Sequence, residues 1–444
     1  SVTSDALTEF IIGHKGNHHS FKRGYKNVIN EAKELNKVGV YAPIAIETSG
    51  HAAFMENYFL DDGAYLIIRI LIKMCQLKKQ NKTILSLIGK QKIISRAEIS
   101  NITHLSKATV SSIVEELLKE NIILEQGEGV STKQGGRKPI NLVFNPSAGY
   151  IVSIDIGAYK CLMAICDLCG NILFKNSIIV KQSEDTLNKI MKAVKELIEG
   201  SGLKHKIIGI GMGIPGITDI ENGVAISVPE LSWKNIQIKN IFEKEFGTRV
   251  YLDNDVNMAL LGEKWLGNAT RYKNFVFINI GYGIGGGIMI NNKIYRGSNY
   301  TAGEFGYLVL TNEALNMKRF TLDEYGYLES VASGSAIEKR MHSSSKEIFE
   351  KANNGDPRAQ SVLCEMIDNL SMGISNIISI LNPEAVIIGG GVSKAGNQLL
   401  LPLKEKIYRL SPFKSNIELS LLGDEAGVIG CAATVLTNEC SINL

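Results

Sequence analysis

The chain has 444 residues, too many for one compact core, and its 45% hydrophobic and 21% charged content is typical of a soluble globular protein of roughly two to four domains. The formal net charge of +3 excludes a polycation, so any affinity for nucleic acid must come from a local basic patch. Seven scattered cysteines exclude a secreted disulfide framework, and no apolar run reaches the roughly 18 residues of a membrane span, so we expect a cytoplasmic protein.

Three segments stand out in the first eighty residues: HKGNHHSFKRGYKNVINEA, IAIETSGHAAF and ENYFLDDGAYL. They resemble a C-terminal part of the phosphoglucomutase/phosphomannomutase family, in which the ETSGH segment, here Glu47 to His51, helps to hold a sugar phosphate. The family's phosphoserine loop and Asp-rich metal loop are absent from the sequence, so the resemblance implies no mutase chemistry. We interpret residues 1–80 as a mutase-like fragment that ends in a helix over about 61–79; an appended sugar-phosphate sensor is the alternative.

Residues 81–146 are predicted to form a winged helix-turn-helix domain. A short first helix follows from the apolar residues between 84 and 88. Ser95 and Glu98 have the spacing of a capping box, which begins a second helix with Ala97 and Ile99 on its inner face. After a turn over 103–105, Ser106 caps a third helix in which apolar residues recur at helical spacing. Two capped helices joined by a short turn are typical of a helix-turn-helix.

A wing is predicted to follow this pair of helices, because strands over 122–124 and 140–144 flank the loop GEGVSTKQGGRKP. Basic residues in such a loop can reach DNA phosphates or a minor groove, and small polar residues near a helix start suit the major groove. The candidate contacts to operator DNA are Ser106, Lys107, Thr109, Ser111, Arg137 and Lys138. The alternative is a capped helical bundle whose hairpin docks another protein.

From residue 147 onward, strands alternate with helices and glycine loops, which indicates an α/β architecture. Three apolar strands run into glycine turns: IVSIDIGAYK at 151–160, FVFINIGYGIGGGI at 275–288 and VIIGGGVS at 386–393. The recurrence predicts two related lobes, over 147–270 and 271–444. Such turns let backbone N–H groups approach phosphate. The candidate phosphate-loop residues are Asp155, Gly157, Gly281, Gly283, Gly389 and Gly390.

Further motifs make the resemblance specific: GIGMGIPGITDIENG, YLDNDVNMALLGE, GYGIGGGIMINNKIYRGSNYTAGEFGY, LNPEAVIIGGGVS and GDEAGVIGCAA. With the GGRKP wing, they resemble the repressor branch of the ROK family, which groups sugar-responsive repressors with sugar kinases, over about 81–444. The resemblance implies two actin-like, ribonuclease H-like α/β lobes with a sugar cleft between them. It implies Gly216 at the edge of the sugar and hydroxyl contacts from Asn254, Asp255, Glu304 and Glu329. In the family's kinases, the position of Asp255 is the general base.

Two departures concern the phosphate loops. The family's kinases have DxGGT in the first loop and GTG in the second, where this chain has Asp155-Ile-Gly-Ala-Tyr159 and Gly281-Tyr282-Gly283. A phenol at both places obstructs the backbone approach to a polyphosphate, which predicts lost use of ATP. Another departure is Glu230, where the family often has Asn: it either enters the cleft and changes the hydroxyl pattern that is recognised, or faces solvent.

A further departure concerns metal. The family often holds zinc through a His and three Cys, and the four positions are here occupied by Tyr307, Phe320, Leu322 and Tyr327. We therefore expect no zinc and no other metal site. Cys166 and Cys169 have CxxC spacing, but no second pair follows, and their setting indicates a hairpin turn.

The sequence thus predicts a sugar-responsive DNA-binding regulator, with a repressor as the first choice. Its expected partners are operator DNA, a sugar effector and a second copy of the chain, since a two-fold protein matches paired half-sites on DNA. No cofactor and no membrane contact are expected. The alternative is an ATP- and magnesium-dependent sugar kinase, similar to glucokinase, with Asp255 as its catalytic base.

Overall fold

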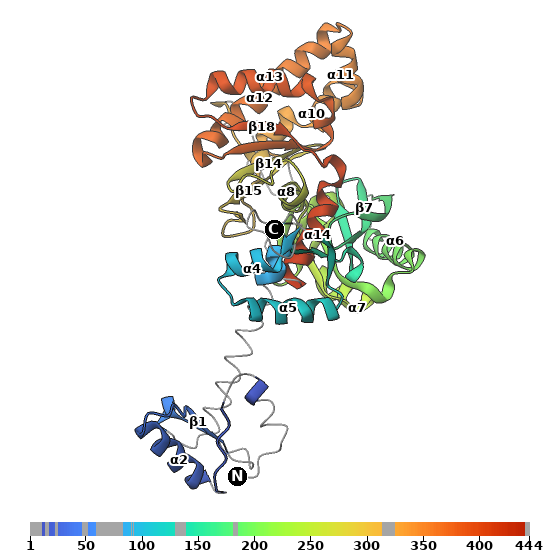
Figure 1. Cartoon of the computed structure of the whole chain (residues 1–444). Helices are drawn as coiled ribbons and strands as arrows, with labels where there is room; N and C mark the ends of the chain where they lie inside the picture. The colour runs from blue at the N-terminus through green and yellow to red at the C-terminus, as the bar shows by residue number, and fades with distance from the viewer. Residues whose placement is uncertain are drawn as a thin grey trace. The chain divides into compact units, whose positions relative to one another are not determined.

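A computed structural model describes residues 11–13, 17–22, 25–46, 52–58, 83–89, 91, 93–128, 139–180, 185–312 and 325–439. The chain divides into two compact units, Ser1–Thr83 and Ile84–Leu444 (Figure 1). Within the described ranges, no helix is long and apolar enough to cross a membrane.

The first unit contains a small mixed core. Helix α2 (Tyr25–Lys37) lies against a hairpin of β1 (Ile44–Ile46) and β2 (Ala52–Phe54), followed by the 3-10 helix η1 (Met55–Asn57). Its buried residues are Ile29, Ala32, Ala45 and Ala53. The ETSGH segment at 47–51 and the helix predicted over about 61–79 lie outside the described residues.

The second unit begins with the segment predicted to form a winged helix, whose wing loop at 129–138 lies outside the described residues. Residues 83–89 are helical, and α4 (Arg96–Thr103) and α5 (Lys107–Lys119) follow, with the three-residue turn between them. The strands β3 (Ile94–Ser95), β4 (Ile123–Glu128) and β5 (Ile140–Phe144) form a sheet of order β3-β5-β4. The predicted capping box is present, and Ser106 caps α5. One detail of the prediction is wrong: Ile99 is buried, but Ala97 is exposed, because it lies in the first turn of α4 on the solvent side.

Lobe I, the part of the unit that follows, has a five-stranded sheet of order β13-β9-β6-β7-β8. Strands β6 (Tyr150–Ile156), β9 (Ile207–Ile214) and β13 (Val250–Asn254) are parallel, and β7 (Lys160–Asp167) and β8 (Ile172–Ile179) are antiparallel. The CxxC segment lies in the β7–β8 hairpin, as predicted, with Cys166 buried and Cys169 exposed. The remaining elements are α6 (Thr186–Ser201), η2 (Pro146–Ala148), η3 (Lys204–Lys206), β10 (Ile217–Asp219), β11 (Val224–Val228), η4 (Pro229–Leu231), β12 (Trp233–Ile236) and α7 (Ile238–Phe246).

Lobe II repeats this arrangement with the order β16-β15-β14-β17-β18. Strands β14 (Phe275–Ile280), β17 (Ala385–Gly389) and β18 (Asn416–Leu419) are parallel, while β15 (Ile284–Ile290) and β16 (Lys293–Ile294) are antiparallel. The equivalent strand orders confirm the two related lobes that the three glycine turns predicted. The remaining elements are η5 (Phe305–Tyr307), α9 (Tyr327–Ala332), α10 (Gly334–Met341), α11 (Ser345–Asn353), α12 (Pro357–Leu381), η7 (Gly391–Ala395), α13 (Asn397–Leu410) and η8 (Gly423–Glu425).

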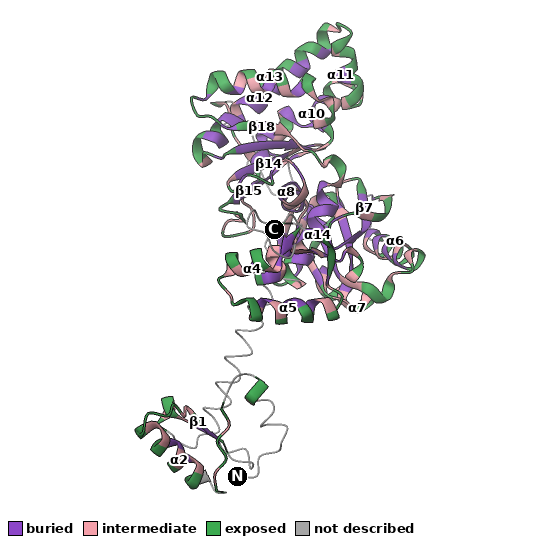
Figure 2. Cartoon of the chain, in the orientation of Figure 1, coloured by how far each residue is buried: buried purple, intermediate pink, exposed green. Residues whose placement is uncertain are grey.

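Two helices join these parts. Helix α8 (Asp255–Leu266) packs along α14 (Ala426–Glu439) at the junction of the lobes (Figure 1). Their backbones approach so closely that a methyl group on Gly430 would overlap the carbonyl oxygen of Met258. Helix α14 is buried over most of its length (Figure 2). Its residues Val428, Ala432, Val435 and Leu436 share one apolar core with the winged helix and with the outer side of the lobe I sheet.

Candidate functional site

The end of β13 and the start of α8 supply the first two candidate residues. Asn254 caps α8: its Oδ1 accepts hydrogen bonds from the backbone N–H groups of Val256 at 2.9 Å and Asn257 at 3.2 Å. Its Nδ2 donates to the carbonyl oxygen of Gly216 at 3.0 Å. Gly216 has φ +76°, and a side chain there would collide with the carbonyl of Ser227, so only glycine suits this turn. The structure therefore brings Gly216, Asn254 and Asp255 together.

The predicted carboxylates converge on the same place from separate segments. Burial raises the pKa of Asp255 well above its ordinary value, and the charges of Asp155, Glu230 and Glu304 add to the effect. Burial likewise raises the pKa of Glu304 to about 7, with contributions from Glu329 and Glu230. The geometry agrees, because α8, α9 and η5, the elements at which Asp255, Glu329 and Glu304 lie, all contact strand β15. A group of neighbouring carboxylates can accept hydrogen bonds from the hydroxyl groups of a polyol.

Glu329 and Glu230 complete this group. Glu329, in α9, accepts a hydrogen bond at 3.1 Å from the backbone N–H of Ile284, and burial raises its pKa. Glu230, in η4, is exposed, yet its charge contributes to the raised pKa of Asp255, Glu304 and Glu329. The two readings of Glu230 are therefore compatible, because this side chain is open to solvent and also borders the carboxylate group.

The three glycine turns lie at the ends of the central strands of both lobes. The backbone N–H of Gly157 donates to the carbonyl of Lys160 at 2.9 Å, and that of Gly281 donates to Gly283 at 3.0 Å. Gly389 ends β17, beside β14, and Gly390 follows it with φ +85°. Asp155 precedes the first turn, and burial together with the charge of Asp424 raises its pKa to about 7. The second and third turns lie side by side in lobe II, since a methyl group on Gly390 would overlap the carbonyl oxygen of Ile280, whereas the first turn ends β6 of lobe I.

Both departures from the kinase pattern meet at these turns. The rings of Tyr159 and Tyr282 contact each other edge to face, with centroids 4.6 Å apart. Tyr325, just before α9, donates its hydroxyl hydrogen to the hydroxyl oxygen of Tyr282 at 2.8 Å. The sequence motifs did not indicate Tyr325. Only the tertiary structure places Tyr325 beside Tyr282, in the second glycine turn.

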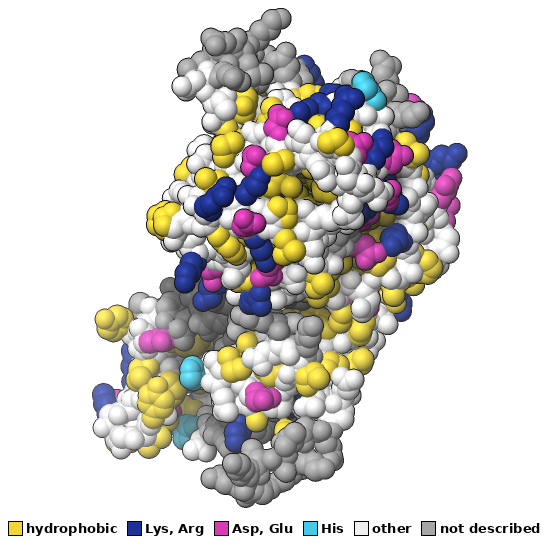
Figure 3. All heavy atoms as spheres, turned by 90° about the horizontal axis from the view of Figure 1, so that it is seen from above, with side chains coloured by type: hydrophobic (Ala, Val, Ile, Leu, Met, Phe, Trp, Pro, Cys, Tyr) yellow, Lys and Arg dark blue, Asp and Glu magenta, His cyan; other side chains and the backbone are white. Residues whose placement is uncertain are grey.

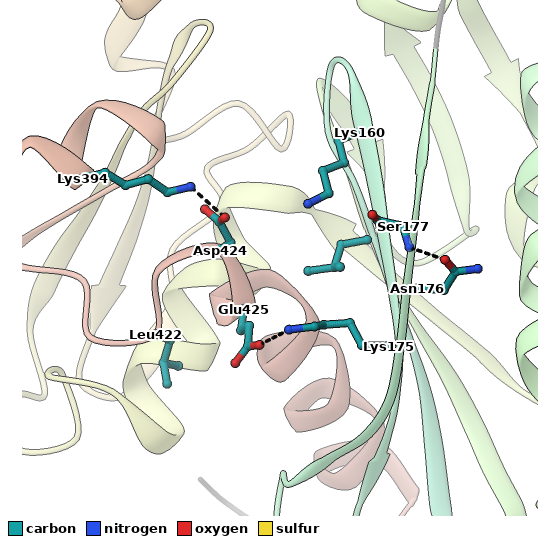
Figure 4. A pocket seen from close by; sticks show the side chains of 9 residues that line it. Lys160, Lys175, Asn176, Ser177, Lys394, Leu422, Asp424 and Glu425 are labelled. Atoms are coloured by element: carbon teal, nitrogen blue, oxygen red, sulfur yellow. Dashed lines mark hydrogen bonds and ion pairs between the residues drawn. The ribbon is translucent and has the colours of Figure 1, made fainter. Parts of the chain in front are cut away.

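A polar cavity of about 520 Å³ opens beside the first glycine turn, between β7–β8 and the segments η7 and η8 (Figure 4). Lys175 pairs with Glu425 at 2.6 Å, and Lys394 pairs with Asp424 at 2.8 Å. Lys160, the residue after Tyr159, points into the same space. Because each acid next to the cavity is matched by a lysine, the lining has only a small excess of positive charge.

Sequence motifs also missed the support beneath Asn254. Asp253 is buried, and its Oδ1 accepts hydrogen bonds from the backbone N–H of Asn254 at 2.8 Å and from Nδ2 of Asn257 at 3.0 Å. Its Oδ2 accepts two more from Arg296. Asp253 lies within the YLDNDVNMALLGE motif and Arg296 within the segment that leads to Glu304, but the sequence alone did not pair them.

The positions of the absent zinc ligands are only partly described. Tyr307 ends η5, and the Tyr327 hydroxyl lies 3.1 Å from Oγ1 of Thr311, whereas Phe320 and Leu322 lie outside the described residues. No group of three or more His, Cys, Asp or Glu residues suited to a metal occurs within the described ranges. The expectation of a zinc-free protein stays a prediction.

The candidate DNA contacts gather at the start of α5. Lys107 is exposed, while the Ser106 and Thr109 hydroxyl groups lie 2.8 Å apart and Ser111 is half-buried. Arg137 and Lys138, in the wing, lie outside the described residues. On the face shown in Figure 3, the acidic and basic side chains of the described residues are interspersed.

Comparison with known proteins identifies this architecture. The model of the ROK family matches residues 151–438. The chain belongs to the ROK family. A second model, for domain III of phosphoglucomutase/phosphomannomutase, matches residues 1–91, in agreement with the predicted resemblance of the first eighty residues.

The relatives of this chain include proteins named as repressors and proteins named as kinases. A xylose repressor from Caldicellulosiruptor bescii is 34% identical over 394 residues, covering 82% of this chain and 97% of its own length. A glucokinase from Halalkalibacterium halodurans is 32% identical and covers 66% of this chain and 97% of its own. A crystal structure of a ROK family transcriptional regulator, a homologue of the E. coli Mlc protein, matches with TM-score 0.70 and 24% identity over 83% of this chain and 98% of its own, and supports the fold.

Proposed function

We propose that this ROK protein is a sugar-responsive transcriptional repressor that binds operator DNA through its winged helix. The observation that carries the proposal is the single apolar core that joins the winged helix to α14, the helix that packs against α8 beneath the carboxylates. The matches support it, because the repressor relative extends over 82% of the chain and the glucokinase relative over 66%.

The effector is an aldose, and D-xylose is the first candidate, since the most extensive relatives are named xylose repressors. Asp255, Glu304 and Glu329 would accept hydrogen bonds from its hydroxyl groups. The Asn254 amide, with one N–H already donated to Gly216, retains another for a hydroxyl oxygen. Gly216 would form the edge of the site.

The signal would travel through α8 and α14. A sugar that engages both lobes stabilises their closed arrangement relative to the open one. Because α8 begins at Asn254 and Asp255 and its backbone touches α14, a shift of α8 displaces the core that α14 shares with the winged helix. In a homodimer, this displacement would change the spacing of two recognition helices and therefore operator affinity.

The kinase alternative rests on Asp255, which lies at the position of the general base in the family's kinases and whose pKa is raised by burial. Transfer also needs a preorganised cradle for the γ-phosphate, and the paired rings of Tyr159 and Tyr282 fill the space between the two glycine turns. We therefore infer that the protein binds sugar without appreciable ATP-dependent phosphorylation. Robust release of ADP in the presence of sugar and magnesium, lost in Asp255→Asn, would favour the kinase.

The deciding experiment is selection of duplexes from a random DNA pool by the full-length chain, followed by fluorescence anisotropy on the selected site. We expect specific binding that D-xylose changes at least tenfold, with mannitol as the polyol control. Failure to select any duplex would refute DNA binding. Selection without a response to D-xylose or to any other aldose would refute the sensor role.

A further inference from the structure

Three phenol side chains from distant segments form a cluster at the junction of the lobes. Tyr159 comes from the turn between β6 and β7, and Tyr282 from the turn between β14 and β15, with an angle of 84° between their rings. Tyr325 donates to the Tyr282 hydroxyl, and the Lys339 ammonium lies 4.7 Å from the centroid of the Tyr325 ring. We call these three residues the tyrosine cluster.

The tyrosine cluster adjoins the carboxylates of the proposed sugar site. Gly283, the residue after Tyr282, lies directly against the Glu329 carboxylate, and the next N–H, that of Ile284, donates to it. Burial and the hydrogen bond with Tyr282 raise the pKa of Tyr325, and the charge of Glu329 adds to the effect. The tyrosine cluster therefore lies at the two glycine turns, and the second of these turns contacts Glu329.

The positions of the sugar hydroxyl groups determine which sugars the bulk of the tyrosine cluster would exclude. In a sugar kinase, the attacked hydroxyl lies between the base and the phosphate loops. The least hindered hydroxyl of a hexopyranose is the primary one, on the exocyclic carbon C6. A hexose bound with that group toward Asp255 would direct it at the tyrosine cluster, whereas a pentopyranose has only hydrogen there.

Resting on the proposed function, we propose that the tyrosine cluster makes the effector site selective for aldopentopyranoses over aldohexopyranoses. An exocyclic carbon directed at the cluster would meet the rings of Tyr159 and Tyr282, which pack edge to face, and Tyr325 holds Tyr282 by a hydrogen bond. Admitting a hexose would require their separation. A pocket that rejects one extra carbon by close packing discriminates by roughly 10- to 200-fold.

The test is isothermal titration of the full chain with three sugars that differ only at C5: D-xylose, 6-deoxy-D-glucose and D-glucose. We expect D-xylose to bind at least tenfold more tightly than either of the others. Equal rejection of the two hexoses identifies a steric cause, because 6-deoxy-D-glucose has the carbon without the hydroxyl. Equal affinity for all three would overturn the inference while leaving the proposed function intact, and failure of all three to bind would contradict the proposed sugar site itself.

Variants assign the selectivity to the cluster. Tyr159→Ala and the double variant Tyr159→Ala/Tyr282→Ala should reduce the ratio of D-xylose affinity to D-glucose affinity at least tenfold. Tyr159 is 53% exposed, so its single variant opens the cluster with little risk to folding. Tyr159→Phe/Tyr282→Phe, which keeps the bulk, should keep the selectivity, as should the control Tyr408→Ala on α13, where the side chain is 52% exposed. Unchanged discrimination in a folded Tyr159→Ala protein would overturn the inference.

Discussion

Arg296 binds Asp253 from the opposite lobe, with Nε at 2.9 Å and Nη2 at 2.6 Å from the same carboxylate oxygen, Oδ2. The Asp253 side chain is only 5% exposed, and its other oxygen holds the backbone N–H of Asn254 and the amide of Asn257. Arg296 is thus a positioning residue, since it orients through Asp253 the residues proposed to meet the sugar. It also anchors the segment that continues to Glu304.

Replacing Arg296 should weaken sugar binding although this side chain is not itself proposed to contact the sugar. Arg296→Ala leaves a buried carboxylate unpaired, so we expect a loss of roughly 2–4 kcal/mol in unfolding free energy and at least tenfold weaker sugar binding. Arg296→Lys keeps the charge but loses the paired donors, and should recover only part of the affinity. Arg409→Ala, at an exposed position on α13, is the control. Wild-type sugar affinity in folded Arg296→Ala, measured by titration calorimetry, would exclude the positioning role.

Stability should depend on pH through Glu304. Burial and the neighbouring carboxylates Glu329 and Glu230 raise its pKa to about 7, so between about pH 4.5 and 7 the folded state binds more protons than the unfolded state. This contribution to stability is present at low pH and is lost as the pH rises through about 7.

Glu304→Gln should therefore differ little from the wild type at pH 5 and melt about 2–4 °C higher at pH 8, a modest effect because Glu304 is exposed. Thermal melting at both pH values checks this, with Glu350→Gln, on the exposed side of α11, as the control. An equal difference at the two pH values would contradict the proposed burial effect.

The contact of α8 with α14 should be sensitive to a single methyl group. In Gly430→Ala, the new carbon would overlap the Met258 carbonyl, so the helices must separate at a cost of roughly 1–3 kcal/mol. We expect the variant to lose much of the effect of sugar on DNA binding in the anisotropy assay. Gly200→Ala, in α6, adds the same carbon in open space and should behave as the wild type. If Gly430→Ala kept the full effect of sugar on DNA binding, α14 would not transmit the signal.

DNA affinity should depend on the start of α5 rather than its end. Lys107 is exposed beside the N-cap, where a lysine can reach a phosphate, so Lys107→Ala should weaken operator binding and reduce the salt slope by roughly one unit. Arg137→Ala, in the wing, should act in the same direction. The matched control is Lys119→Ala, at the other end of α5 and also exposed. Equal losses in the Lys107 and Lys119 variants would indicate a general charge effect instead.

The protein should contain no zinc. Tyr307 and Tyr327 occupy two of the positions where the family often has metal ligands, and their phenols offer poor ligands compared with thiolate or imidazole. Elemental analysis of protein purified without chelator should find well under one zinc per chain. One equivalent that survives dialysis would contradict the prediction.

Local sequence determined the elements of this protein and much of its site. The Ser95 and Glu98 spacing specified a helix start because a capping box depends only on two residues three positions apart, and the glycine turns marked the strand ends that both lobes repeat. Asp255, Glu304 and Glu329 were candidates because each lies in a motif that resembles the ROK family, and in the structure the elements at which they lie all contact β15; their role in binding sugar stays a prediction.

Only the tertiary structure decided which distant residues meet. Arg296 and Asp253 are separated by 43 positions, and Tyr159 and Tyr282 belong to different lobes, so no local pattern links them. The misprediction of Ala97 has a local cause instead: residues two apart point to different sides of a helix, so Ala97 cannot share the buried side of Ile99. Contacts between distant residues follow from how two lobes close around two crossing helices, and that arrangement depends on the whole chain at once.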